Sequence, residues 1–128
     1  MKKKEARDME QELQLKLTIR LCTESGQRCF GPGVAALLAQ VELCRSLRAA
    51  AAAMEMAYSK AWRIVHTAEE AFGCKLLSST VGGVHGGGAV LTPEGRRLLD
   101  AYNAYLADVE SYARRQFPDL LRHPPKAE

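Results

Sequence analysis

The sequence predicts one domain of the α+β class, mostly α, on three observations. A stretch near the N-terminus alternates apolar and polar residues with the period of a strand, three later stretches have the apolar spacing of helices, and a glycine cluster separates two short apolar runs. The chain has 128 residues, of which 47% are hydrophobic and 26% are charged, as is typical of a soluble globular domain. We expect a charged N-terminal segment over residues 1–12, the domain over 13–117 and a flexible tail over 118–128.

The first predicted element is a strand over residues 13–22, LQLKLTIRLC. Its apolar residues occupy every second position, so one face is expected to be buried. Ser25 and Gly26 then predict a turn into a short return strand.

Two helices are predicted next. Pro32 suits the first turn of a helix that carries Val34, Leu37, Leu38 and Val41 at helical spacing and ends near Cys44. Ser46 is a good N-cap for the second helix, LRAAAAAM, whose alanines favour helix and allow another helix to approach closely.

A third helix is predicted over residues 58–72 and is terminated by Gly73. About three residues join it to the alanine-rich helix, a spacing that fits a helix-turn-helix and a plain helical hairpin equally well. Its expected inward stripe is Ala61, Trp62, Val65, Ala68 and Phe72, which favours a core role for Trp62 over a stacking role.

The glycine cluster lies between two candidate strands, KLLSST (residues 75–80) and AVL (residues 89–91). Five of the ten glycines fall within residues 82–88, so they are expected at the tip of a hairpin. Thr92 as N-cap and Pro93 then begin a long helix over about residues 92–117. Its apolar seam could belong to the core, but a small domain rarely needs so long a helix to cover itself, so a two-fold interface between protomers is preferred. The seam residues are Leu98, Leu99, Tyr102, Tyr105, Leu106, Val109 and Tyr112.

Neither catalysis nor a cofactor is expected. The glycines could form a phosphate cradle, but they do not match the spacing of the known nucleotide-binding loops, and there is no local cluster of nucleophile and base. The four cysteines show no C-x-x-C pairing, so no metal site is expected. No apolar run approaches the ~20 residues that span a bilayer, and no secretory signal follows residues 1–12, so we expect a cytoplasmic protein without membrane contact. The net charge of +3 permits a nucleic-acid partner without requiring one.

The order of elements resembles the winged-helix DNA-binding domain of the molybdate-responsive ModE family, a relative of the LysR-type domain. The resemblance is carried by GPG before the first helix, by AAAAAMEMAYSKAW across the turn, and by GGVHGGGAVLTPEGRRLL into the last helix. It implies a winged helix-turn-helix fold and a cytoplasmic, homodimeric transcriptional regulator of double-stranded DNA. The third helix would then read DNA, and the long final helix would pair two protomers.

The sequence departs from this family at three places. Glu55 stands in the turn where glycine is usual, and Ala57 replaces a capping serine, so the turn lacks the residue that most easily takes positive φ. Val84 and His85 stand in the wing, where relatives often carry lysine or arginine. Family members that sense molybdate have oxyanion-binding domains after the final helix, whereas this sequence ends at Glu128, so we expect no molybdate binding by that route.

Exposed polar residues of the third helix are the main candidates for DNA contact. Arg63 suits a bidentate contact to guanine, and Lys60 suits phosphate. Arg45, Ser46 and Arg48 surround the start of the second helix, where phosphate can bind. The expected DNA-binding residues are Arg45, Ser46, Arg48, Tyr58, Ser59, Lys60, Arg63, Thr67, Lys75, Gly82, Gly83, His85, Gly86 and Gly87. The alternative is a dimeric winged-helix adaptor without specific DNA binding, in which these charges are only solvated.

Overall fold

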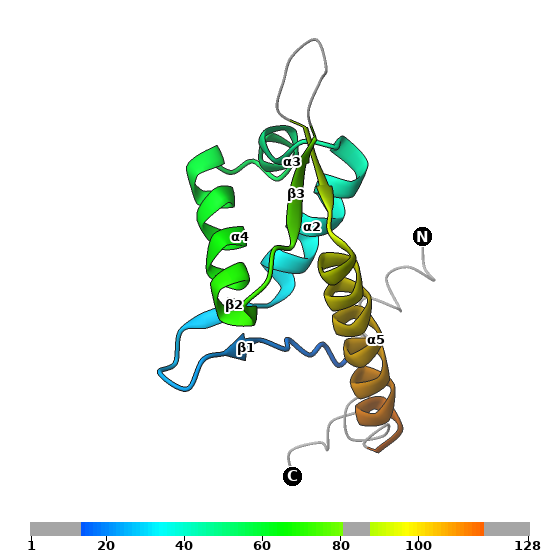
Figure 1. Ribbon diagram of the computed structural model, residues 1–128. Helices are drawn as coiled ribbons and strands as arrows, with labels where there is room; N and C mark the ends of the chain where they lie inside the picture. Colours follow the sequence, from blue (N-terminus) through cyan, green and yellow to red (C-terminus); the bar gives the residue numbers. More distant parts are fainter. Residues whose placement is uncertain (1–13, 81–87, 117–128) are drawn as a thin grey trace, which may run out of the picture. The chain divides into compact units, whose positions relative to one another are not determined.

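The computed structural model describes residues 14–80 and 88–116, and the predicted segments 1–12 and 118–128 lie outside this part. Contacts divide the chain into two compact units, whose described parts are residues 18–80 with 88–104 and residues 14–17 with 105–116. The described residues form two antiparallel strand pairs and four helices, which confirms the mostly-α winged helix-turn-helix (Figure 1). The elements are β1 (Leu21–Cys22), β2 (Arg28–Phe30), α2 (Pro32–Cys44), α3 (Leu47–Ala53), α4 (Tyr58–Phe72), β3 (Leu77–Thr80), β4 (Gly88–Leu91) and α5 (Pro93–Gln116).

The first hairpin is shorter than the alternating pattern predicts. The prediction of a strand over residues 13–22 is wrong. Within the described part of that stretch, strand pairing is confined to β1, which pairs with the three-residue return strand β2. The side chains still alternate in burial, since Leu15, Leu17 and Ile19 are half-buried and their neighbours are exposed. The predicted turn is confirmed: Gly26 takes φ +92° and its N–H donates to the Thr23 carbonyl at 2.8 Å.

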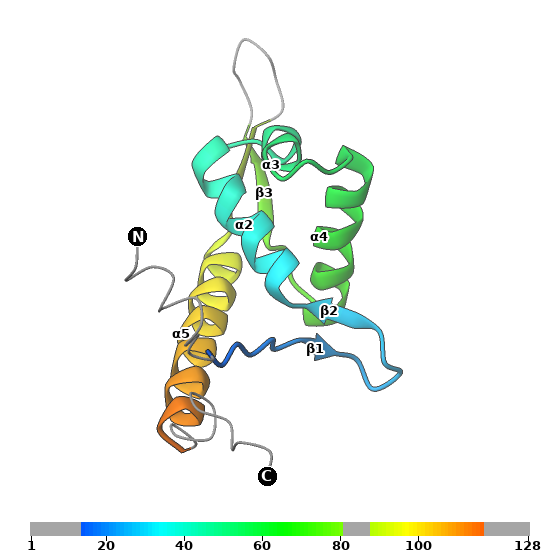
Figure 2. The same cartoon turned by 180° about the vertical axis from the view of Figure 1, so that it is seen from behind.

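The core of the larger unit is built where α2, α3 and α4 meet. Leu37 and Val41 of α2 are fully buried against Ala50 and Ala51 of α3 and Ala61 of α4. Because alanine methyl groups are small, the three helix backbones approach closely at this point. Figure 2 shows α2 crossing in front of the β3–β4 hairpin, against which it also packs.

The helix ends follow the expected chemistry. Pro32 begins α2, and the Ser46 hydroxyl accepts the Ala49 N–H of α3 at 3.1 Å. Gly73 ends α4 in the left-handed region with φ +69°. Thr92 caps α5 by accepting the Gly95 N–H at 2.9 Å. These four predictions are therefore confirmed.

The turn between α3 and α4 forms without glycine. Glu55 itself takes the left-handed conformation, with φ +55°, and its N–H donates to the Ala52 carbonyl at 3.0 Å. Met56 N–H donates to the Ala51 carbonyl at 2.9 Å, which completes the turn. Ala57 precedes α4 and makes no side-chain cap, as its residue type implies. The unusual turn sequence therefore leaves the turn intact at the cost of a strained residue.

The second hairpin joins the helices to the start of α5. β3 and β4 pair in register from Leu77 with Leu91 to Thr80 with Gly88. Thr92 N–H donates to the Leu76 carbonyl at 3.0 Å, so α5 begins directly beside β3. Gly95 packs so closely on Leu76 that a Cβ atom would collide with the Leu76 carbonyl oxygen. A glycine is needed here for close approach of two backbones.

An aromatic cluster connects the first hairpin to α5. The Phe30 ring lies 5.1 Å from the Tyr102 ring and 6.1 Å from the Phe72 ring, measured between centroids. The Tyr102 hydroxyl donates to the Ile19 carbonyl at 2.8 Å. Burial raises the pKa of Tyr102, and the positive charge of Arg20 opposes this rise. Tyr102 therefore remains a neutral hydrogen-bond donor at physiological pH.

The described part of the smaller unit comprises residues 14–17 and 105–116. Its helical part, the C-terminal half of α5, carries a half-buried stripe at helical spacing, namely Leu106, Val109, Glu110 and Ala113. An ion pair joins Arg114 to Glu110 at 3.9 Å, and the Arg115 guanidinium donates to the Ser111 hydroxyl at 2.6 Å. Surface pairs of this kind contribute little stability.

We expect Gly95→Ala to lower the free energy of unfolding by about 1–3 kcal/mol, because the new methyl group must displace the Leu76 backbone. Urea denaturation measures this change. Gly33→Ala is the matched control, since nothing lies within 4 Å of a Cβ at Gly33 in α2; it should leave stability unchanged or raise it. Equal effects of the two substitutions would contradict the close approach at Gly95.

We expect Glu55→Gly to raise the free energy of unfolding by about 1 kcal/mol, because glycine relieves the strain of positive φ in the turn. Thermal and urea unfolding give the value. Ala52→Gly, an exposed position within α3, should instead lower stability by about 1 kcal/mol. Destabilisation by both glycines would show that Glu55 is not strained.

Candidate nucleic-acid interface

The exposed surface of α4 is defined by its buried side. Ala61, Val65 and Ala68 are buried, which at 3.6 residues per turn leaves Ser59 and Arg63 on the opposite side. Both of these are exposed. The helix therefore presents a polar row to solvent along its first two turns.

Trp62 is not in the core, which corrects the sequence interpretation. Its side chain is 50% exposed and its ring stacks on His66 at 4.6 Å with 16° between the planes. His66 Nε2 lies 2.8 Å from a Glu70 carboxylate oxygen, so the three side chains form a row along α4. Trp62 lies at the edge of the predicted stripe, beside Ala61, and it lines a groove instead of joining the core. Phe72 is also 38% exposed, but one edge packs on Phe30.

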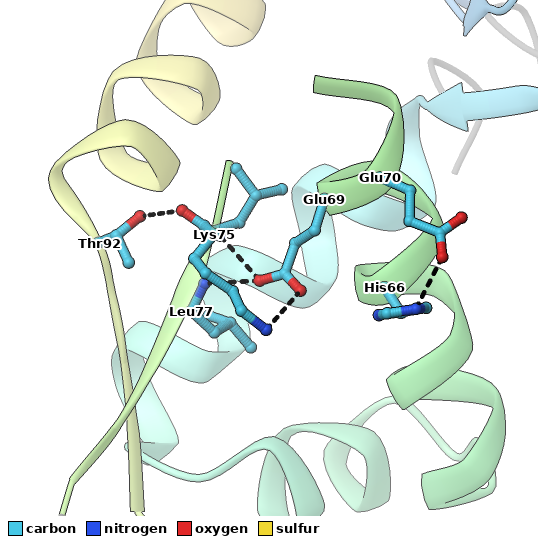
Figure 3. Close-up of polar contacts among 7 residues, drawn as sticks. His66, Glu69, Glu70, Lys75, Leu77 and Thr92 are labelled. Carbon is cyan, nitrogen blue, oxygen red and sulfur yellow. Dashed lines mark hydrogen bonds and ion pairs between the residues drawn. The ribbon is translucent and has the colours of Figure 1, made fainter. Parts of the chain in front are cut away.

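Glu69 fixes the second hairpin to α4. Its Oε2 accepts the backbone N–H groups of Leu76 at 2.8 Å and Leu77 at 3.3 Å. Figure 3 shows the Glu69 carboxylate pointing from α4 toward Lys75 and Leu77. The Lys75 ammonium lies 3.8 Å from Oε1 of the same carboxylate, and the Lys75 carbonyl accepts the Thr92 hydroxyl at 2.6 Å. Sequence reasoning missed Glu69, because no local pattern shows that an acidic residue near a helix end will bond to a later strand.

A groove of about 490 Å³, here called the wing-side groove, lies between α4 and the β3–β4 hairpin. Arg48 reaches it from α3, with its guanidinium 4.2 Å from the centre of the Tyr58 ring. Lys75 borders it from the segment before β3. The lining comprises Leu47, Arg48, Tyr58, Trp62, Val65, His66, Glu69, Lys75, Leu77, Ser78, Ser79, Gly88 and Ala89.

A second groove of about 470 Å³, here called the hairpin-side groove, lies on the other flank of α4. It brings the predicted residues Lys60, Arg63 and Thr67 together with Arg20 and Arg28, which sequence reasoning did not single out. The other lining residues are Gln27, Cys29, Phe30, Gly31, Pro32, Gly33, Val34 and Ile64. The predicted site residues are thus divided between two flanks of one helix.

Several predicted site residues have other positions. Arg45 is exposed at the end of α2, with φ +58°, and its carbonyl accepts the Ala89 N–H at 3.0 Å. Ser46 is half-buried, and its hydroxyl is used as the α3 cap. The predicted wing residues Gly82, Gly83, His85, Gly86 and Gly87 lie outside the described residues.

The seam residues of α5 differ in exposure. Leu99 and Tyr102 are buried in the larger unit, so they already serve its core. Leu98, Leu106 and Val109 are half-buried, whereas Tyr105 and Tyr112 are 61% and 57% exposed. Among the seam residues of α5, the apolar surface that another chain could cover is therefore concentrated at Tyr105 and Tyr112.

No helix within residues 14–80 and 88–116 is long and apolar enough to cross a membrane. The same residues contain no group of three or more histidine, cysteine or acidic side chains placed to hold a metal ion.

Comparison with known proteins agrees with this geometry. Residues 35–96 match the family described as "Bacterial regulatory helix-turn-helix protein, lysR family". The chain is also similar to the molybdenum-pterin-binding protein MopB of Rhodobacter capsulatus, with 39% identity over 74 residues. That match covers 58% of this chain but only 27% of MopB, so it concerns about a quarter of the relative. The predicted resemblance to ModE-type and LysR-type domains is confirmed, and the described elements within residues 35–96 have the order of a winged helix-turn-helix.

Proposed function

We propose that the protein is a sequence-specific DNA-binding transcriptional regulator that acts as a homodimer, with α4 in the major groove. The observation that carries this proposal is the exposed polar row of α4, which has cations on both flanks. The LysR-type regulatory match supports it, because helix-turn-helix proteins place their second helix in the major groove. Such a regulator acts on bacterial DNA, so we also propose a cytoplasmic location.

Within α4, the roles divide by position. Arg63 lies opposite the buried face and has a planar fork of donors, so we assign it to a guanine edge. Lys60 lies on the flank of the helix and lines the hairpin-side groove, so we assign it to phosphate. Tyr58, Ser59 and Thr67 are the remaining α4 candidates.

The wing side supplies further proposed backbone contacts. Arg48 and Lys75 border the wing-side groove, and the side chain of Lys75 is 78% exposed. Residues 81–88 contain five glycines, which would allow a close approach to the DNA backbone or the minor groove because glycine has no side chain. His85 is the residue in this segment whose attraction for phosphate would rise below about pH 6.5.

A dimeric adaptor without specific DNA binding is the alternative function. The departure at Glu55 favoured it from sequence, because glycine is usual in the turn. The structure removes that reason, since Glu55 takes the left-handed conformation and the α3–α4 turn is hydrogen-bonded. Two observations still favour an adaptor: the modest net charge of +3, and Val84 and His85 in the wing, where relatives often carry lysine or arginine.

A selection from random-sequence DNA is expected to enrich a two-fold symmetric site whose affinity falls steeply with salt. Against that site, Arg63→Ala should relax specificity at one base step, at a cost of about 1–3 kcal/mol for the preferred sequence. Lys60→Ala should weaken binding to all sequences alike.

Glu24→Ala, in the turn of the first hairpin, is a control that should change neither the base specificity nor the affinity of DNA binding. Failure to enrich any site, together with a flat salt response, would favour the adaptor. Equal and sequence-blind losses from Arg63→Ala and Lys60→Ala would refute the assignment of Arg63 to a base.

We propose that the homodimer forms through α5. Tyr105, Val109 and Tyr112 follow one another at steps of four and three residues, so they share one face of the helix. Large exposed tyrosines on one face are typical of residues that a second chain covers. Leu99 and Tyr102 are not part of this proposed interface, because the larger unit buries them.

The double substitution Tyr105→Glu with Val109→Glu is expected to give monomers, because a dimer would have to bury two pairs of like charges. Light scattering gives the mass of the species in solution. Ala107→Glu lies on the opposite face of α5 and is exposed, so it should leave the dimer intact. A doubly substituted protein that remained dimeric would locate the interface elsewhere.

A further inference from the structure

The hairpin-side groove concentrates positive charge. Arg20, Arg28, Lys60 and Arg63 line it, and no carboxylate is among its lining residues. Within residues 14–80 and 88–116, none of these four cations is in an ion pair with a carboxylate. By contrast, Lys75 on the wing side and Arg96 and Arg97 on α5 each have an acidic partner. Unpaired like charges in one groove repel each other, so the groove is suited to an anionic partner.

The start of α2 adds to this potential. Gly31 offers no capping side chain, and there is no acidic residue in the first turn. Gly33 and Val34 line the groove, and their backbone N–H groups belong to the first turn of a 13-residue helix. The positive end of the helix dipole therefore lies beside the four cations.

The cationic side chains are held on an ordered framework. Arg20 packs its aliphatic stem on Gly31, where an added Cβ would lie only 3.0 Å from the Arg20 Cγ. The preceding residue, Ile19, is tied to α5 by the Tyr102 hydroxyl. Arg28 is in β2, paired with Cys22 of β1. Little additional ordering is needed for these groups to meet a ligand.

The position of the groove indicates which anion it fits. The major groove is about 12 Å wide and is bounded by one phosphate backbone on each side of an inserted helix. The wing-side groove and the hairpin-side groove lie on the two flanks of α4. If the wing side meets one backbone, the hairpin side faces the other.

We propose that the hairpin-side groove binds the phosphate backbone of the second DNA strand, with Arg20 and Arg28 as phosphate ligands beside Lys60. This rests on the proposed insertion of α4 in the major groove and extends the interface to the first hairpin. The contacts carry no sequence information, because phosphates are the same at every base step. Their effect is to fix the register of α4 on the duplex.

The test compares the salt dependence of binding to the selected DNA site for wild type, Arg20→Ala and Arg28→Ala. Affinity falls as salt rises, so the plot of log affinity against log salt has a negative slope. Each substitution should make this slope less steep by about one per bound protomer. The affinity loss per protomer should therefore be about fourfold smaller at about 200 mM than at about 50 mM salt. Arg28→Lys should retain most of the binding, because phosphate accepts a point charge.

Arg97→Ala is the matched control, since Arg97 is exposed on α5, is paired with Glu94 and lines neither groove. It should leave the slope unchanged, and circular dichroism should show native folding for all variants. A wild type that binds with a steep slope that neither Arg20→Ala nor Arg28→Ala changes would overturn this inference and leave the proposed function standing. A wild type that binds no DNA would overturn both.

Titration with inorganic phosphate shows whether the hairpin-side groove binds a free phosphate ion instead of the phosphates of DNA. We expect the protein to bind inorganic phosphate weakly at most, and we expect Arg20→Ala and Arg28→Ala to lower its affinity for DNA. Calorimetric phosphate binding that Arg28→Ala abolishes, with DNA affinity unchanged, would show a site for a free anion instead and would overturn the assignment to DNA.

Discussion

Close packing of small side chains at the junction of α2, α3 and α4 is the constraint on which the rest of the structure depends. Ala50 and Ala61 are fully buried, and Ala51 nearly so, against Leu37 and Val41. A larger residue at any of these alanines would push α4 away from α2 and α3. The exposed row of α4, the hairpin anchored by Glu69 and both grooves would shift with it. The candidate interface is thus determined by alanines that never touch a ligand.

Local chemistry explains which parts of the fold the sequence predicts well. The Ser46 and Thr92 caps, Pro32 at a helix start and Gly73 at a helix end depend on one residue and the next few along the chain. The first strand depends on a partner instead. Its apolar alternation extends over about ten residues, but β2 offers only three for pairing, so most of the stretch has no ladder. Apolar alternation therefore predicts which side chains are buried, but a strand forms only where a second strand is available for pairing.

The site was harder to predict than the fold, because its parts come from distant segments. Periodicity identifies the face that α4 buries at Ala61, Val65 and Ala68, but not how wide that face is. Trp62 is one position beyond Ala61, and only the structure shows that its side chain is half exposed. Arg20 and Arg28 precede α4 by thirty residues or more, and no spacing rule connects them to Lys60. A net charge of +3 conceals this clustering, because it averages over the whole chain.

The distribution of charge along α4 favours contact with an anion at one end only. Lys60 and Arg63 are in the N-terminal half, where the helix dipole is also positive and Ala57 provides no capping side chain. Glu69 and Glu70 are in the C-terminal half. Glu69 is committed to the backbone of β3, whereas the Glu70 side chain is 70% exposed and would repel phosphate. His66 lies 2.8 Å from Glu70 and offsets that charge when it is protonated. In the proposed complex, this distribution would attract a duplex to the first two turns of α4 and repel it from the last, and would thereby orient the helix before any base is read.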